Sequence, residues 1–309
     1  MKSAELTAHK KSFVDGLQVY WDATSITLAQ TCLRKYYYTM IRGVTRRERS
    51  VHLIFGGIYA SALESFYKLR ASGLSIEDAL RQIIRDAMVE SWDSEAGAPV
   101  HFDDTKKTRP NLIRTIVWYI DQFADESKDG IKTYHLQSGK PAVELSFALE
   151  VDDDLVLCGH LDRVVEFGDA LYVMDQKTTG GTIGTYYFDG FSPDNQMSLY
   201  SWAGRAVLHS PVRGVIIDAA QIAVNFTRFE RGITTRSKDQ LDEWFDTARW
   251  TIDSARQACA LDHFPMNTTA CGNYGGCEFR GICSRSPAVR ENYLKSDFTG
   301  HVWDPIERR

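Results

Sequence analysis

The sequence predicts an α/β fold, in which a central mixed β-sheet is flanked by helices and preceded by a helical part. Amphipathic helical patterns dominate the chain before Pro141. Short β-rich runs follow it, separated by Asp-rich and Gly-rich turns. A helix, an apolar strand and a long helix complete an order typical of α/β cores. We therefore divide one domain over 25–285 into a helical part (25–140), a sheet core (141–226) and a C-terminal helix with a cysteine loop (237–285).

The helical part contains four predicted helices. Ser25 is a suitable N-cap for the first, which includes Cys32. Ser75 and Asp78 form a capping box at the start of the third, and apolar residues follow with helical spacing. The helices are expected over residues 25–38, over 54–69, from Ser75 onward, and over 111–125. Residues 1–24 ahead of them are expected to be loosely ordered, and 286–309 to form a C-terminal tail.

The sheet core begins with an antiparallel meander of four short strands. They are expected over residues 142–150, 155–159, 162–167 and 170–175. A helix over 196–207 and an apolar strand over 214–225 follow. Ser237 and Gln240 form a capping box for the last helix, which reaches about residue 260.

Composition limits the classes of protein to consider. The chain has 309 residues, is 43% hydrophobic and 25% charged, and has a net charge of −5, which together are ordinary for a globular protein. No apolar run approaches the roughly 20 residues of a membrane helix, and the N-terminus lacks a secretory signal pattern. We therefore expect a cytoplasmic protein without membrane contact. In a reducing compartment, clustered cysteines indicate metal or redox ligands and not disulfides.

Two acids and a lysine form the strongest catalytic candidate. Asp162 lies in GHLDRV, and Asp175 and Lys177 end the strand LYVMDQK. Because side chains alternate along a strand, Asp175 and Lys177 point the same way. Two carboxylates and the backbone carbonyl of Gln176 would suit Mg²⁺ or Mn²⁺, which could activate water for phosphodiester hydrolysis. Lys177 would orient or deprotonate that water, or neutralise charge in the transition state.

A surface Asp–Lys pair is the commoner explanation of an isolated D-x-K triplet. The context here favours a site, because Asp175 follows an apolar strand, where a charge needs a partner or a metal. GHLDR followed by DQKT resembles the PD-(D/E)XK nuclease superfamily, specifically its RecB-type branch. The resemblance extends over residues 25–285 and implies a restriction-endonuclease-like core.

Four further residues resemble accessory positions of that family. Gln196 and Tyr200 match its Q-x-x-x-Y motif and lie one helical turn apart, where they could brace the lysine or contact the strand. Glu144 falls where the family often has a Glu. Glu64 matches the last residue of its G-x-x-x-H-x-x-L-E pattern and could bind metal, or could only pair with a basic residue. Ala60 stands where that pattern has its His, a departure that puts a second metal ion and full activity in doubt.

The cysteines form a second candidate centre. Cys271, Cys277 and Cys283 lie in a Gly-rich tail, and Cys32 lies near the other end of the chain. This spacing lacks the close Cys pairs of structural zinc sites, so it favours an iron–sulfur cluster over zinc or free thiols. It resembles a subset of RecB-type nucleases, including the helicase–nuclease subunit AddB and CRISPR-associated adaptation nucleases. The resemblance implies a [4Fe–4S] cluster that fastens the two ends of the domain.

Basic and aromatic residues provide candidate DNA contacts. Those predicted are Arg34, Lys35, Tyr36, Arg228 and Arg231, with buried tyrosines and a solvated basic face as the equal alternative. The resemblance implies a metal-dependent DNA exonuclease that acts on single-stranded or end-opened DNA, with a helicase or recombination protein as a partner. A catalytically weak or inactive DNA-binding module of the same fold is the alternative, and a zinc-held scaffold is a third.

Overall fold

The computed structural model describes residues 13–14, 16–47, 50–100, 104–208, 210–301 and 303–306. The predicted loosely ordered segment 1–24 lies outside the described residues at 1–12 and at 15. The chain forms two compact units. The first comprises Met1–Glu48, Ser146–Gly159 and Ser237–Arg309, and the second comprises Arg49–Leu145 and His160–Arg236.

The second unit is built on a mixed sheet. Strand β10 (Ala170–Thr179) pairs antiparallel with β9 (Leu155–Phe167) and parallel with β11 (Val212–Ile222). Strand β12 (Thr227–Thr234) pairs antiparallel with β11, and the short β7 (Ile131–Thr133) with β9. A parallel pair needs a crossover connection, which here contains a helix between β10 and β11. The predicted α/β class with a mixed sheet is confirmed.

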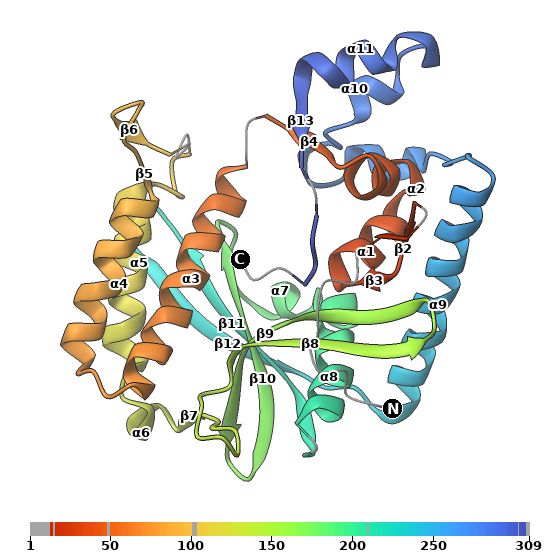
Figure 1. Cartoon of the computed structure of the whole chain (residues 1–309). Helices are drawn as coiled ribbons and strands as arrows, with labels where there is room; N and C mark the ends of the chain where they lie inside the picture. Colours follow the sequence, from red (N-terminus) through yellow and green to blue (C-terminus); the bar gives the residue numbers. More distant parts are fainter. Residues whose placement is uncertain are drawn as a thin grey trace. The chain divides into compact units, whose positions relative to one another are not determined.

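Helices cover both faces of this sheet. Helices α3 (Val51–Ala71), α4 (Ile76–Glu90) and α5 (Arg109–Phe123) lie side by side and share one apolar core with Ala220 of β11 (Figure 1). Helix α8 (Asn195–Val207), in the crossover, packs on the other face. There a Cβ on Gly204 would come within 3.2 Å of the Val173 side chain, so glycine allows the close approach of helix and strand.

The first unit joins the two ends of the chain. Helix α1 (Ala23–Thr31) packs against the long α9 (Lys238–Ala260), as the bond of 3.3 Å from Gln30 Nε2 to Thr251 Oγ1 shows. The buried Trp21 of β3 (Tyr20–Trp21) pairs with the start of β9 and stacks on Tyr36 at 5.3 Å between ring centroids. Strand β8 (Val143–Asp152) pairs with β9, and both strands contribute residues to each unit.

The remaining elements are short. They are β1 (Phe13–Val14), β2 (Leu17–Gln18), α2 (Leu33–Tyr36), the π-helix η1 (Tyr37–Ile41), β4 (Val44–Arg46), β5 (Trp92–Asp93), β6 (Ala98–Pro99), α6 (Glu126–Asp129), α7 (Thr185–Asp189), the 3₁₀ helix η2 (Thr268–Gly275), α10 (Arg280–Cys283), α11 (Pro287–Asp297) and β13 (Phe298–Gly300). No helix in the described part of the chain is long and apolar enough to span a membrane.

One expected helix and two expected strands differ from the structure. The helix expected over 25–38 is interrupted at Cys32, whose φ of −169° is extended and which ends α1 and caps α2. The N-cap of α1 is Asp22, and Ser25 is its capping-box partner at N3. The strands expected over 155–159 and 162–167 are one continuous strand, β9, because no turn residue separates them.

Candidate active site

The three predicted catalytic side chains lie together in the second unit. Strand β10 places Asp175 and Lys177 on one face, and Lys177 Nζ lies 2.5 Å from Asp175 Oδ2. Asp162 extends from the neighbouring β9, and its Oδ2 accepts the backbone N–H of Gln176 at 3.0 Å. The pairing of β9 with β10 therefore brings two carboxylates and one ammonium group to a single place.

This site has an excess of buried negative charge. Asp175 is 1% exposed, and neither of its carboxylate oxygens has a hydrogen bond of normal geometry. Burial raises the pKa of both Asp162 and Asp175, and the charge of Asp175 raises the pKa of Asp162 further. Burial lowers the pKa of Lys177, but Asp175 and Asp162 together raise it by more. One ammonium group cannot neutralise two carboxylates. The site therefore has a net negative charge that would attract a metal cation.

The donor set fits a hard divalent cation. Mg²⁺ commonly takes only one or two carboxylates from a protein and fills its other positions with water and phosphate oxygens. Asp162 and Asp175 provide such a pair. Among the described residues, no group of three or more His, Cys, Asp or Glu side chains is arranged to hold a metal ion.

Helix α8 fixes the position of the lysine. Lys177 Nζ donates to Gln196 Oε1 at 3.0 Å, and Gln196 Nε2 donates to the Tyr200 hydroxyl at 3.1 Å. The N-cap Asp194, which accepts the Met197 backbone N–H at 2.9 Å, fixes the start of the helix. The bracing contact that the Q-x-x-x-Y spacing predicts is therefore present.

Glu144 lies near the acids in a strained conformation. Its φ is +52°, in the left-handed region that costs a non-glycine residue about 1–2 kcal/mol. Its charge contributes to the raised pKa of Asp162. Its Oε1 lies 3.7 Å from Nδ1 of His160, which precedes Asp162 by two residues on β9. Backbone strain of this kind concentrates at functional sites.

Glu64 has a different environment from the other accessory residues. It forms an ion pair with Lys68 one turn later on α3, which is the alternative that the sequence left open. Ala60 lies on the same helix.

Lys107 is a buried lysine beside the end of β10 that the sequence analysis missed. It is 3% exposed, and its Nζ donates to the carbonyl and hydroxyl oxygens of Thr178 at 3.3 and 3.1 Å. Burial lowers its pKa to about 8. Lys107 thus holds the residue next to Lys177, yet no local pattern in TKKT marks it, because the contact spans 71 positions of the chain.

The cysteines predicted to bind a cluster all belong to the first unit. The Asn267 backbone N–H donates to Cys32 Sγ at 3.3 Å, and Cys271 Sγ lies 3.8 Å from the Asn267 carbonyl. Cys277 and Cys283 pack against a common apolar cluster around Phe279.

Several neighbouring groups, including two of the other cysteines, shift the pKa of Cys283. Burial raises the pKa of Cys283, Arg290 and Arg34 lower it, and Cys277 and Cys32 raise it. None of the six cysteines forms a disulfide.

The predicted DNA contacts have different surroundings. Tyr36 is buried and donates to Gln18 Oε1 at 2.9 Å, so its ring is part of the core. Arg34 Nε donates to the Phe264 carbonyl at 2.7 Å, and Lys35 is half-buried. Arg228 is exposed and lies 3.3 Å from Glu230.

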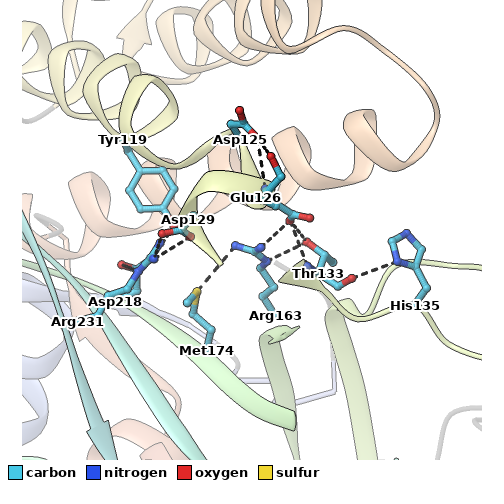
Figure 2. Close-up of polar contacts among 11 residues, drawn as sticks. Tyr119, Asp125, Glu126, Asp129, Thr133, His135, Arg163, Met174, Asp218 and Arg231 are labelled. Atoms are coloured by element: carbon cyan, nitrogen blue, oxygen red, sulfur yellow. Dashed lines mark hydrogen bonds and ion pairs between the residues drawn. The ribbon is translucent and has the colours of Figure 1, made fainter. Parts of the chain in front are cut away.

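Arg231 is part of a buried network of charges beneath helices α5 and α6. Its guanidinium lies 2.6 Å from Asp129 Oδ1 and 3.0 Å from Asp218 Oδ1 (Figure 2). The same group lies 3.9 Å from the centre of the Phe123 ring. Arg163 of GHLDR forms a parallel contact, 2.7 Å from Glu126 Oε1. Figure 2 shows that both arginines extend from the sheet toward α6. These contacts show that Arg231 fixes α6 to the sheet. They also occupy most of its N–H donors, so few remain to bind a phosphate.

Comparisons with known proteins extend these observations. A family model described as the PD-(D/E)XK nuclease superfamily matches residues 21–284. A solved structure from Eubacterium rectale, named "Putative exonuclease", is 11% identical with a TM-score of 0.49, over 82% of this chain and 86% of that chain. The structure of SSO0001 is 11% identical with a TM-score of 0.27, over 74% of this chain and 85% of that chain. No curated protein matches the chain.

The family match includes β9, β10 and α8, the elements that carry Asp162, Asp175, Lys177 and Gln196. It extends over most of the chain, so this protein belongs to the PD-(D/E)XK nuclease superfamily.

Proposed function

We propose that this protein is a metal-dependent deoxyribonuclease in which Asp162, Asp175 and Lys177 form the active centre. The observation that carries the proposal is the buried carboxylate of Asp175. Its oxygens have no hydrogen bond of normal geometry, although Asp175 Oδ2 lies 2.5 Å from Lys177 Nζ. A buried charge of this kind is costly and is kept where it binds a ligand or a metal ion.

Each residue of the proposed centre has a separate role in hydrolysis. Asp162, Asp175 and the Gln176 carbonyl would hold Mg²⁺ or Mn²⁺, which supplies a Lewis acid and lowers the pKa of water. Lys177 donates to the attacking oxygen or to the phosphate as charge develops on it. Gln196 holds Lys177 in one rotamer, and Tyr200 holds Gln196. The carboxyl of Glu144 adds a proton acceptor near Asp162.

The finer proposal is an exonuclease of the RecB-type branch that acts on single-stranded or end-opened DNA. GHLDR, DQKT and Q-x-x-x-Y in this order support it, as does the Lys177–Gln196 bond. Among the predicted DNA contacts, Arg228 is exposed, so we retain it as a candidate phosphate ligand. A helicase or recombination protein would supply opened DNA ends, because the sequence contains no Walker A motif.

We further propose that Cys32, Cys271, Cys277 and Cys283 hold a [4Fe–4S] cluster. The partial exposure of the four thiols, a backbone N–H directed at Cys32 Sγ and two arginines near Cys283 support this proposal. Among the described residues, no three of these side chains are grouped to hold a metal ion, so a cluster would have to draw them together. Protein purified without oxygen should show broad absorption near the blue, and Cys277→Ser should lose it while the buried Cys158→Ser should not. A colourless protein with stoichiometric zinc would reject the cluster.

The main proposal is tested with an end-labelled oligonucleotide incubated with Mn²⁺, Mg²⁺ or EDTA. Wild-type protein should shorten the strand only with metal, and Asp175→Asn should abolish cleavage. Asp169→Asn serves as the matched control, because Asp169 lies in the turn before β10 with its side chain 97% exposed. DNA binding without cleavage in either metal would favour the alternative that Ala60 suggests, an inactive DNA-binding module.

A further inference from the structure

An exposed group of aromatic and basic residues lies at the edge of the sheet where β10 and β11 end. These two strands are parallel, and Thr179 pairs with Gln221, so their last residues lie at one edge. Beside this edge are Trp118 of α5 and Val224 and Phe226 of the β11–β12 turn, exposed by 42%, 53% and 48%. We call Lys106, Arg114, Trp118, Val224 and Phe226 the aromatic–basic strip.

Hydrogen bonds hold the strip in one piece. Arg114 donates to the carbonyls of Ala223, Val224 and Phe226 at 2.7, 2.9 and 3.1 Å, and its guanidinium lies 5.4 Å from the centre of the Trp118 ring. The turn is therefore fixed to α5, and the two aromatic side chains are presented by a rigid support. A rigid support reduces the entropy cost of binding a ligand.

The strip is continuous with the active strand. Lys106 Nζ donates to the carbonyl of Gly180 at 2.6 Å, three residues after Lys177. Asn111 Nδ2 in turn donates to the Lys106 carbonyl at 2.6 Å, which ties this lysine to the first turn of α5. Lys106 therefore joins the strip to the residues that directly follow β10, at the end of the strand that carries Asp175 and Lys177.

The charges of the strip are suited to phosphate. Within the described part of the chain, neither Lys106 nor Arg114 forms an ion pair, although the protein as a whole has a net charge of −5. Their bonds go to neutral carbonyl oxygens, which leave the positive charge in place. The adjacent carboxylate of Asp104 accepts the backbone N–H groups of Lys106 and Lys107 at 2.7 and 2.6 Å.

We propose that the aromatic–basic strip binds a single-stranded segment of the nucleic acid substrate. Bases stack on Trp118 and Phe226, phosphates lie against Lys106, and Arg114 adds positive charge to the surface while its guanidinium holds the turn. Aromatic platforms beside cations are the usual means of binding single strands without reading their sequence. This inference rests on the proposed nuclease function, and it assigns the surface that holds the strand outside the active centre.

The chain offers a matched control for Trp118. Trp92 is also 42% exposed and is also paired with an arginine, because Arg109 lies 5.2 Å from the centre of its ring. Trp92, however, lies on the β5–β6 hairpin, directly before Asp93 and close to Glu95. These acids repel phosphate, so Trp92→Ala should leave binding unchanged.

The test measures binding of a fluorescein-labelled oligo(dT) strand to the full chain by fluorescence anisotropy in EDTA. Trp118→Ala should weaken binding roughly tenfold, and Trp118→Phe should restore it to within about threefold of wild type. Lys106→Gln should lower the slope of log K against log salt by about 0.7, as expected when the protein neutralises one phosphate fewer on a single strand. Circular dichroism and the melting temperature show whether each variant folds.

The outcomes distinguish a failure of the aromatic–basic strip from a failure of the proposed nuclease function. Wild type that cleaves or binds DNA while Trp118→Ala binds equally well overturns the strip and leaves the nuclease intact. Equal losses in Trp118→Ala and Trp92→Ala also overturn it, since any exposed tryptophan would then serve. A wild type that neither cleaves nor binds any strand removes the nuclease function and the strip together.

Discussion

Gln196 bonds to Lys177, the proposed catalytic lysine, and replacing Gln196 with Met tests whether that bond sets the position of the lysine. Lys177 Nζ lies between Asp175 Oδ2 at 2.5 Å and Gln196 Oε1 at 3.0 Å. Methionine keeps the length of the side chain and the helix propensity of α8, but it accepts no strong hydrogen bond. A bond to a charged group contributes about 1.5–3 kcal/mol. If the transition state requires it, Gln196→Met should lower the rate by roughly 10-fold to 150-fold.

The assay is single-turnover cleavage of an end-labelled oligonucleotide at saturating Mn²⁺. The cleavage rate should fall while the affinity for DNA stays within about twofold, because Gln196 contacts the lysine and not the strand. Gln82→Met on α4 is the matched control, since the Gln82 amide bonds to Asp86 on the helix surface. A full rate in Gln196→Met would refute the role assigned to this bond.

Tyr200→Phe examines the same chain of contacts one step further away. The Tyr200 hydroxyl acts on Lys177 only through the Gln196 amide, so its loss should reduce the rate by at most about fivefold. In the double variant the two effects should not add, because the outer contact has no route to the lysine once Gln196 is gone. Full additivity would show that Tyr200 acts by another path.

Three further predictions concern stability. Arg231→Met leaves Asp129 and Asp218 as unpaired buried charges, so the free energy of unfolding should fall by about 3–5 kcal/mol in denaturant titrations; a change below 1 kcal/mol would contradict the role of Arg231 in fixing α6. Glu144→Gly relieves a positive φ and should raise that free energy by about 1 kcal/mol while lowering cleavage, whereas Glu144→Gln should lower cleavage only. The pKa of Lys107 is lowered to about 8 by burial, so the unfolded chain binds more protons between pH 8 and the ordinary lysine value near 10.4, and stability should rise with pH there. Lys107→Met should remove that rise in melting temperature, and an unchanged pH profile would exclude Lys107 as its source.

Local patterns predicted the parts of this molecule that depend on short-range geometry. The period of two along LYVMDQK placed Asp175 and Lys177 on one face, and the helical spacing of Gln196 and Tyr200 placed them toward the lysine. The capping box at Ser237 and Gln240 correctly marked the start of α9. In each case the side chains involved belong to one regular element, so their relation is set by the repeat of that element.

Contacts between distant segments were beyond the reach of these patterns. Tyr36 lies in a basic-aromatic run, but its position in the core depends on stacking with Trp21 from another segment. The carboxylates that neutralise Arg231 come from α6 and β11. The break in the first helix at Cys32 is likewise not marked by a Gly or Pro, because residues 23–38 contain neither.

The most direct test of a shared ion is isothermal titration calorimetry of Mn²⁺ binding to the metal-free protein, with DNA cleavage measured on the same samples. Wild type should bind Mn²⁺ and cut DNA, Asp169→Asn should do both, and Asp162→Asn and Asp175→Asn should each lose the strong binding event and the cleavage together. Undiminished Mn²⁺ affinity or undiminished cleavage in either of the last two variants would contradict a centre in which both carboxylates hold one ion.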